Sequence, residues 1–281
     1  MWDLEDLKTK LSEVEKITNA QWIIGLDGRK KKELEFHDRD RDRSRKESLD
    51  DDSYRKFYGN RKYYDGTVLS RTHVDNWIKV KAKDKVFLDY ACGDGVNAIK
   101  AAKAGAKLAI GIDISRLSVE NAKRDAEKEG VQDNTYFLQA DAENTKLPDN
   151  SIDVVLCNGM LHHLDLSYVF PELRRIMSKE GQLLAVEALN YNPLIKLYRY
   201  LTPLMRTEWE KKHILSLADV RFAKKFFDVQ DICYWHVTSI LTPYCRSLLP
   251  VWNAFDKVFA KIPLIRQLAW IFTFELHRKV D

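Results

Sequence analysis

Three aspartates each follow a short apolar run, and their carboxylates could share one ligand site. They are Asp89, Asp113 and Asp141, which follow the runs 86–88, 108–112 and 136–140. Apolar runs of this length are typical of buried parallel strands. Because the carboxyl ends of parallel strands meet at one edge of a sheet, the three carboxylates would line a crevice there. They could bind positive charge or accept hydrogen bonds from hydroxyl and amino groups.

A glycine turn follows the first of these aspartates and leads into a helical pattern. Gly93, Asp94 and Gly95 form this turn, and their spacing also fits the dinucleotide-binding pattern. A helix N-terminus attracts the pyrophosphate of a dinucleotide, whereas the carboxylate of Asp94 would repel it. S-adenosylmethionine carries an ammonium and a sulfonium but no phosphate, so it suits the acidic positions better. An NAD-dependent oxidoreductase is the less favoured alternative.

Several motifs in register extend this pattern over residues 84–190. They are LDYACGDG at 88–95, GIDIS at 111–115, DA at 141–142, LPDNSIDVV at 147–155 and NGMLHHL at 158–164. Together they resemble the class I S-adenosylmethionine-dependent methyltransferases. The resemblance implies S-adenosyl-L-methionine as cofactor, with its methionine end near Asp89, its ribose near Asp113 and its adenine near Asp141. The full set of cofactor-binding candidates is Asp89, Ala91, Gly93, Asp94, Gly95, Asp113, Ile114, Asp141, Ala142, Asn158, Gly159 and Arg71.

The order of strand-like and helix-like segments predicts an α/β fold. Strands are expected over 86–89, 108–112, 136–140, 152–157 and 182–189, and helices over 95–104, 116–129 and 167–178. Two later segments, 226–237 and 268–279, read as the last two strands, and the resemblance implies that they pair antiparallel. We therefore expect a Rossmann-like, seven-stranded, doubly wound sheet with an antiparallel last strand. An N-terminal helical cap (1–83), the cofactor-binding core (84–190) and a region of substrate-side helices and last strands (191–281) make up the chain.

Two adjacent histidines, His162 and His163, follow the fourth predicted strand. A neutral imidazole is well suited to take a proton from a hydroxyl or ammonium near neutral pH. The alternative is a structural role, because Leu-His-His-Leu recurs here in methyltransferases with unlike substrates. The loop 158–164 looks like that of phosphoethanolamine methyltransferases, where the histidine matching His163 serves the active site. We therefore expect His163, more than His162, to be catalytic.

The segment before the core carries candidates for substrate contacts. Aromatic residues gather between positions 54 and 69, and in related enzymes this place caps the cofactor pocket. The substrate-binding candidates are Tyr58, Tyr63, Tyr64 and His37, although aromatic clusters more often serve packing. Arg71, in a helix expected over 70–80, could pair with the cofactor carboxylate or lie on the surface.

Two regions near the chain's start differ sharply in composition. Residues 1–28 have apolar side chains at helical spacing, so we expect an amphipathic helix packed on the domain. Residues 29–52 are almost continuously charged, and a nucleic-acid-binding arm is one interpretation. Their charges alternate in sign, which cancels the counterion-release drive for phosphate binding, so a solvated helix or loop is favoured. The opening of this stretch, 33–38, is loosely similar to segments that fold over the cofactor in some methyltransferases.

Composition excludes several other classes. The net charge is only +4 and 45% of residues are hydrophobic, so we expect no nucleic-acid partner. Cys92, Cys157, Cys233 and Cys245 lack metal-ligand spacing, which argues against bound metal and against disulfides and favours the cytoplasm. No signal peptide or membrane-spanning run is recognised. The oligomeric state is not indicated.

An apolar stripe in residues 241–267 leaves one question open. Leu248, Val251, Trp252, Phe255 and Phe259 recur at helical spacing, and such a stripe more often packs on its own protein. The alternative is an interfacial helix, which would imply peripheral membrane contact, or a lid over an apolar substrate. The sequence thus predicts a methyltransferase acting on an oxygen or nitrogen of a small acceptor, which would be amphiphilic if the stripe forms a lid. A non-catalytic or lipid-modifying cofactor-binding protein that docks through 241–267 is the alternative.

Overall fold

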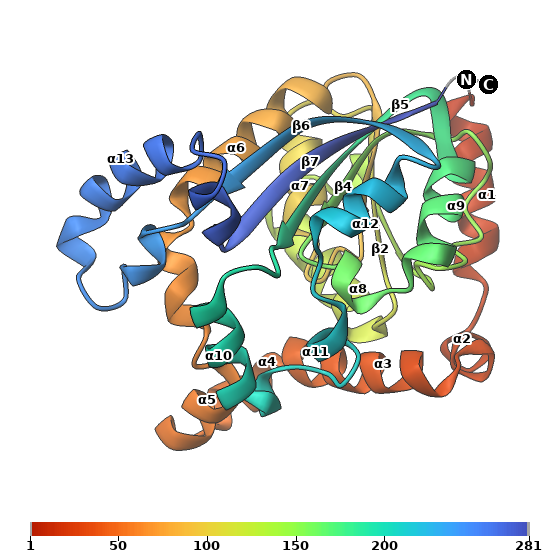
Figure 1. Ribbon diagram of the computed structural model, residues 1–281. Helices are drawn as coiled ribbons and strands as arrows, with labels where there is room; N and C mark the ends of the chain where they lie inside the picture. The colour runs from red at the N-terminus through yellow and green to blue at the C-terminus, as the bar shows by residue number, and fades with distance from the viewer. Residues whose placement is uncertain (1, 280–281) are drawn as a thin grey trace.

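A seven-stranded mixed sheet forms the centre of the computed structural model, which describes residues 2–279 (Figure 1). The strands are β1 (Val86–Tyr90), β2 (Leu108–Asp113), β3 (Thr135–Gln139), β4 (Ile152–Asn158), β5 (Met177–Ala188), β6 (Phe227–Trp235) and β7 (Ile271–Arg278). Their order is β3-β2-β1-β4-β5-β7-β6, and β7 runs antiparallel to both of its neighbours. The predicted fold class is confirmed. Strand β1 pairs with β2 and β4 in parallel, so its carboxyl end lies at the middle of the binding edge.

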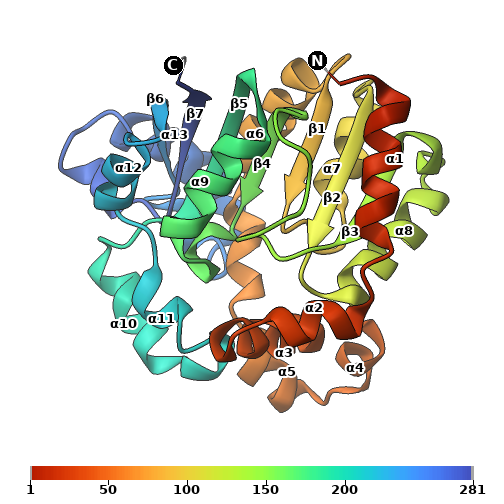
Figure 2. The ribbon, with the colours of Figure 1, turned by 90° about the vertical axis from the view of Figure 1, so that its right-hand side faces the viewer.

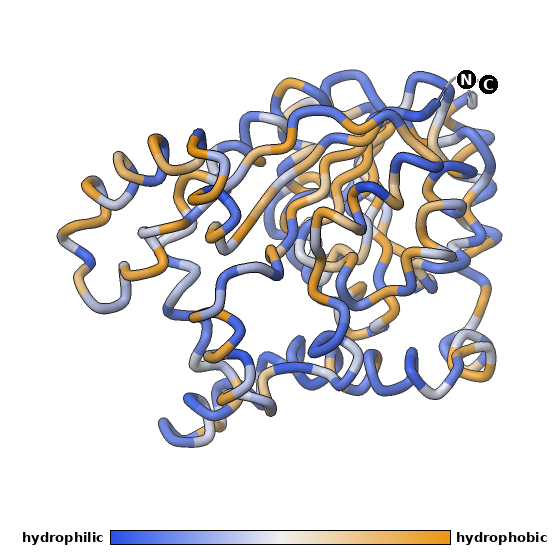
Figure 3. The backbone as a smooth tube through the Cα atoms, in the orientation of Figure 1, coloured by the Kyte–Doolittle hydropathy of each residue, from blue (hydrophilic) through white to orange (hydrophobic). Residues whose placement is uncertain are grey.

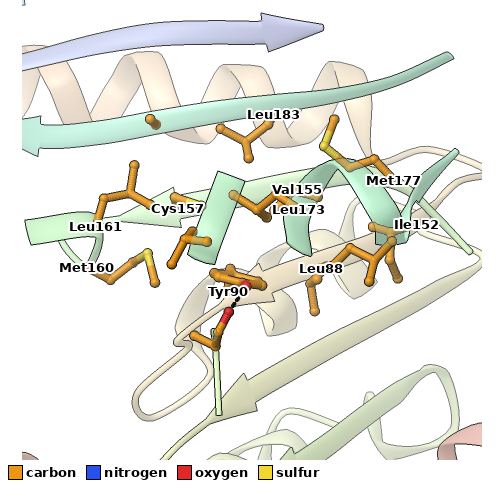
Figure 4. Close-up of a cluster of buried hydrophobic side chains, with 14 of the residues drawn as sticks. Leu88, Tyr90, Ile152, Val155, Cys157, Met160, Leu161, Leu173, Met177 and Leu183 are labelled. Atoms are coloured by element: carbon orange, nitrogen blue, oxygen red, sulfur yellow. Dashed lines mark hydrogen bonds between the residues drawn. The ribbon is translucent and has the colours of Figure 1, made fainter. Parts of the chain in front are cut away.

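Helices cover both faces of the sheet. On one face lie α6 (Val68–Lys81), α7 (Val96–Lys103) and α8 (Arg116–Lys128), and on the other lie α1 (Leu4–Glu15), α9 (Leu166–Ile176) and α12 (Leu217–Ala223). Leu7, Leu11 and Val14 bury the apolar side of α1, which confirms the expected amphipathic helix. Figure 4 shows the core beneath α9, where the buried hydroxyl of Tyr90 donates a hydrogen bond to the carbonyl of Ala142. This bond holds the loop that contains Ala142 against β1 of the sheet.

A group of N-terminal helices crosses the carboxyl edge of the strands (Figure 2). They are α2 (Asn19–Gly25), α3 (Gly28–Arg41), α4 (Arg43–Ser48) and α5 (Asp51–Tyr58). Aspartates are the N-cap residues of three of these helices. The side chains of Asp27, Asp42 and Asp50 accept hydrogen bonds from backbone amides in the first turns of α3, α4 and α5. The prediction that this charged stretch is a solvated helix or loop holds for only one face of α3, where Lys31, Lys32 and Glu35 are exposed. Glu33 is buried, because the other face of α3 packs against the sheet edge.

Two insertions extend the C-terminal half. The first holds α10 (Pro193–Leu201) and α11 (Glu210–His213), and the second holds α13 (Leu249–Phe259), which projects from the sheet in Figure 1. Short 3-10 helices lie at Arg61–Gly66, Gln132–Asn134, Leu161–His163, Pro203–Met205, Ser239–Leu241, Arg246–Leu248 and Ile265–Leu268. Within residues 2–279, no helix is both long and apolar enough to cross a membrane.

The apolar stripe of α13 does not pack inward, so the favoured expectation for it is wrong. Phe255 is 46% exposed and Val258 is 56% exposed. Figure 3 shows hydrophobic residues along this projecting helix. Its one buried residue is Asp256, whose carboxylate accepts a hydrogen bond of 2.6 Å from the backbone amide of Thr238. The helix is therefore anchored through a polar contact, and its apolar face is left largely free.

Candidate active site

The glycine turn after β1 is folded tightly around a buried carboxylate. Asp89, which is 1% exposed, accepts a hydrogen bond of 3.2 Å from the backbone amide of Ala98 at the start of α7. Burial raises the pKa of Asp89 to about 7, although this hydrogen bond opposes the rise. Gly95 has φ of +74°, and a β-carbon there would lie 2.6 Å from the Phe137 ring. Only glycine satisfies both the backbone conformation and this close packing.

Two other aspartates, unlike Asp89, line a cavity at this edge of the sheet. Asp113 accepts hydrogen bonds of 2.9 Å from the backbone amides of Gly93 and Ser115, which fixes the end of β2 against the glycine turn. Asp141 accepts a bond of 2.9 Å from the amide of Glu143. The cavity measures about 90 Å³, and its core-side lining includes the predicted residues Ala91, Asp113, Ile114, Asp141, Ala142, Asn158 and Gly159. The buried carboxylates suit the ammonium, ribose and adenine donors of S-adenosylmethionine, so the residues present fit this cofactor.

Helix α3 forms the roof of this cavity and supplies positive charge. Lys30 lies 2.6 Å from the carboxylate of Asp141 and 2.9 Å from that of Glu143, and Arg29 lies 2.6 Å from Glu143. Burial opposes the charge of Lys30, yet the two carboxylates outweigh it and raise the pKa of Lys30. Arg41 packs on the glycine turn, because a β-carbon on Gly93 would lie 2.7 Å from its guanidinium. Each core acid that faces the roof therefore has a cation near it.

Among these roof residues only His37 was predicted, as a substrate contact, although the sequence carries a signal for the others. Lys30, Glu33, His37 and Arg41 recur every three or four positions, so they share one face of α3. All four line the cofactor cavity. The spacing identifies a common face, whereas Asp141 and His163, which Lys30 and Glu33 contact, lie more than a hundred residues further along the chain.

His163 lies on the wall between the cofactor cavity and a larger second cavity of about 600 Å³. Its Nδ1 atom is 2.9 Å from a carboxylate oxygen of Glu33, and its ring lies 4.8 Å from that of His37. Burial, together with the nearby His163, holds the pKa of His37 well below its usual value, so His37 is neutral. Glu33, His37 and His163 also converge closely enough to hold a metal ion. That the site works without metal stays a prediction.

His162 belongs to a second carboxylate–imidazole pair, built by the sheet itself. Its Nδ1 atom lies 2.6 Å from Glu187 at the end of β5. Glu187 also accepts hydrogen bonds of 2.9 and 2.7 Å from the backbone amides of Met160 and Leu161. Burial disfavours a charged imidazole, but the charge of Glu187 outweighs burial and raises the pKa of His162. Glu187 is a functional candidate that sequence reasoning missed, because a glutamate within a strand carries no distinguishing spacing.

The substrate-side candidates are brought to the second cavity and its neighbour. Tyr58, Tyr64 and His37 line the second cavity, and Tyr63 lines a third cavity beside it. Five cofactor candidates do not line the cofactor cavity: Asp89, Gly93, Asp94 and Gly95 near the glycine turn, and Arg71. Asp94 turns toward Asn121, whose side-chain amide donates a hydrogen bond of 3.0 Å, and it does not line the cofactor cavity. Arg71 is exposed and lines a fourth hollow, which shares Asn158 with the cofactor cavity and Tyr64 with the second cavity.

Comparison with known proteins agrees with this geometry. A family model described as a methyltransferase domain matches residues 88–185. Over 107 residues the chain is 37% identical to 27-O-demethylrifamycin SV methyltransferase of Amycolatopsis mediterranei, covering 38% of this chain and 39% of that protein. Over 101 residues it is 36% identical to ribosomal protein L11 methyltransferase of Pasteurella multocida, covering 36% of this chain and 33% of that protein. The matched segments thus span well under half of these relatives.

Solved structures show the same fold over a longer part of the chain. The YcgJ protein of Bacillus subtilis superposes with a TM-score of 0.51 at 18% identity, covering 75% of this chain and all of that one. A geranyl diphosphate C-methyltransferase of Streptomyces coelicolor, solved with S-adenosyl-L-homocysteine, gives 0.55 at 14% identity, covering 74% of this chain and 76% of that one. The family match shows that residues 88–185 form a methyltransferase domain, for which S-adenosylmethionine is the cofactor, and the solved structures show the same fold.

Proposed function

We propose that the protein transfers a methyl group from S-adenosylmethionine to an oxygen or nitrogen of a small acceptor. The bound cofactor would supply a methyl carbon activated by its sulfonium. In this proposal Asp89 faces the methionine ammonium, Asp113 the ribose hydroxyls and Asp141 the adenine edge. One observation carries the proposal: His163 lies on the wall shared by the cofactor cavity and the 600 Å³ cavity. A group at that wall can reach both the cofactor and an acceptor.

His163 is the proposed general base. Glu33 lies 2.9 Å from its Nδ1 atom, so a proton on Nδ1 would be held there and Nε2 would be left to accept the acceptor's proton. His162 suits this task less well, because its raised pKa favours the charged form, which has no lone pair to accept a proton. The cap and the core would mainly align the acceptor with the methyl carbon and exclude water.

Replacing His163 by alanine tests this assignment. We expect turnover to fall by roughly 10²–10⁴-fold, the usual worth of a positioned general base, with little change in cofactor affinity. Turnover is measured as formation of S-adenosylhomocysteine with a panel of small hydroxyl and amine acceptors. His73→Ala is the matched control, because His73 lies on α6, where it packs against Trp235 of β6. If His163→Ala keeps full turnover while His162→Ala abolishes it, the base is His162.

A second role at a lipid surface is favoured by the outward-facing apolar residues of the two insertions. Leu194, Leu197 and Tyr200 on α10 are 75%, 54% and 81% exposed, and α13 has a similar face. Such helices suit the interface of a membrane. In this proposal α10 and α13 form the contact to a membrane or an amphiphilic acceptor. We also propose that the enzyme acts in the cytoplasm, a reducing compartment that suits its four free cysteines.

A further inference from the structure

A third cavity of about 390 Å³ continues from the acceptor side of the site. It shares Tyr64, His162 and Trp270 with the 600 Å³ cavity, so the two are contiguous. Its walls come from the two insertions and the 3-10 helix Arg61–Gly66. Most of its lining is aliphatic or aromatic, including Tyr63, Leu194, Ile195, Tyr198, Ile240, Leu241 and Tyr244. The cavity is thus suited to an apolar group attached to the acceptor.

One cation in this apolar wall has a buried guanidinium nitrogen that lacks a hydrogen-bond partner. The Nη1 atom of Arg199 is buried and has no hydrogen-bond partner among the described residues. Burial, with the neighbouring Arg206, lowers the pKa of Arg199 to about 10, which still leaves it charged at neutral pH. A buried charge without a partner is costly, and buried charges in proteins are generally paired. The charge of Glu210 offsets part of this cost, but the ion pair of Glu210 is with Arg206.

The other charged groups of the cavity are already matched. Arg206 donates a hydrogen bond of 3.1 Å to the carbonyl of Thr202 and lies 3.4 Å from the carboxylate of Glu210. His162 is paired with Glu187 at 2.6 Å. After these two pairs, one positive charge, that of Arg199, is left over. The third cavity therefore combines an apolar lining with a single unmatched guanidinium.

We propose that the methyl acceptor is an amphiphile with an oxyanion, a carboxylate or a phosphate, that binds in this cavity with its oxyanion on Arg199. A planar guanidinium binds either oxyanion through two parallel hydrogen bonds. The apolar part of the acceptor packs against Leu194, Ile195 and Ile240, and its nucleophile extends past His162 into the second cavity. This inference rests on the proposed function only in taking the ligand to be the methyl acceptor. Binding of an anionic amphiphile in the third cavity does not depend on catalysis.

Calorimetric titration with octyl phosphate, octanoate and octanol tests the site without knowing the natural acceptor. We expect at least one of the two anions to bind about tenfold or more tightly than octanol, and the stronger anion shows whether the site prefers phosphate or carboxylate. Arg199→Gln should reduce anion binding to the level of octanol. Arg116→Gln, a change at an exposed arginine of α8, should leave it unchanged.

Three results would overturn the proposal. They are equal affinity for octanol and both anions, unchanged anion affinity in Arg199→Gln, and binding of inorganic phosphate as tight as that of octyl phosphate. Should Arg199→Gln fail to fold, Arg199→Lys keeps the charge but loses the planar fork, and weaker anion binding is expected from it. Titration of the same samples with S-adenosylhomocysteine distinguishes failure of the proposed function from failure of the Arg199 site. If S-adenosylhomocysteine does not bind the wild type, only the proposed function is refuted.

Discussion

Cofactor affinity should depend on pH through Asp89, the carboxylate at the end of β1. Burial raises its pKa to about 7, so about half of the molecules hold it protonated at neutral pH. The cofactor's ammonium is attracted to the ionised carboxylate and not to the neutral acid. Binding must therefore favour the ionised form and release a proton from the fraction that holds one. Affinity should rise as the pH rises through 7.

The size of the effect follows from the ionised fraction. With a pKa of about 7, roughly a tenth of the molecules carry an ionised Asp89 at pH 6 and roughly nine-tenths at pH 8, so the affinity should increase about tenfold between them. Isothermal titration calorimetry with S-adenosylhomocysteine, which keeps the ammonium, measures this dependence. Repeating the titration at pH 7 in buffers of different ionisation enthalpy should show the release of about half a proton per ligand.

Asp89→Asn provides the decisive comparison, because an amide keeps the shape but does not titrate. This variant should bind more weakly at pH 8 and lose the tenfold rise. Asp133→Asn, a change at an exposed acid beside β3, should behave like the wild type. A wild-type affinity that is flat between pH 6 and pH 8, or an equal rise in Asp89→Asn, would refute the assignment of Asp89 to the ammonium.

Three further predictions follow from other parts of the site. Asp113→Ala should weaken cofactor binding by about 1.5–3 kcal/mol, the range for a hydrogen bond to a charged group, and unchanged calorimetric affinity in the folded variant would remove Asp113 from the site. Glu187→Gln should lower the free energy of unfolding by about 1.5–3 kcal/mol at pH 5.5 and by less at pH 9, measured in urea. The loss is larger at low pH because the raised pKa of His162 in the folded state stabilises the fold fully below the usual histidine pKa, and this contribution disappears as the pH rises through the raised value. An equal loss at both pH values would contradict the pairing of His162 with Glu187. Phe255→Asp with Val258→Asp should abolish co-sedimentation with anionic vesicles and leave cofactor affinity unchanged, and a wild type that ignores vesicles at low salt would exclude the membrane role.

The sequence predicted the core well because its signals are local. Each strand of the cofactor-binding half is a short apolar run, and each carboxylate follows its strand by chain connectivity alone. Asp113 and Asp141 therefore line one cavity as expected, whereas Asp89 is buried against the start of α7 and does not line it. Asp94 shows the limit of the same reasoning. It lies within the motif, yet its side chain points to Asn121 because the left-handed turn directs it away from the cavity.

Tertiary partners could not be predicted, since nothing in a single sequence pairs positions that are far apart. Glu187 is one of several acidic residues in the strands, and only the packing of the loop 158–164 against β5 gives it three hydrogen-bond donors. The apolar stripe of α13 was misjudged for a related reason. Periodicity shows that a helix has an apolar face, but it does not show whether any surface of the chain covers that face.

The charged stretch 29–52 shows how such a pattern can be misread. Alternating charges predict a solvated segment because, in isolation, the neighbours of each side chain are its own near residues and water. In the folded chain, Lys30 and Glu33 of α3 reach Asp141 and His163 across a separation of more than a hundred residues. Mixed charge is what such a roof requires, since one face must meet both carboxylates and imidazoles. The alternation that argues against nucleic acid is therefore equally consistent with a helix whose inward face pairs with the charges of the site below it.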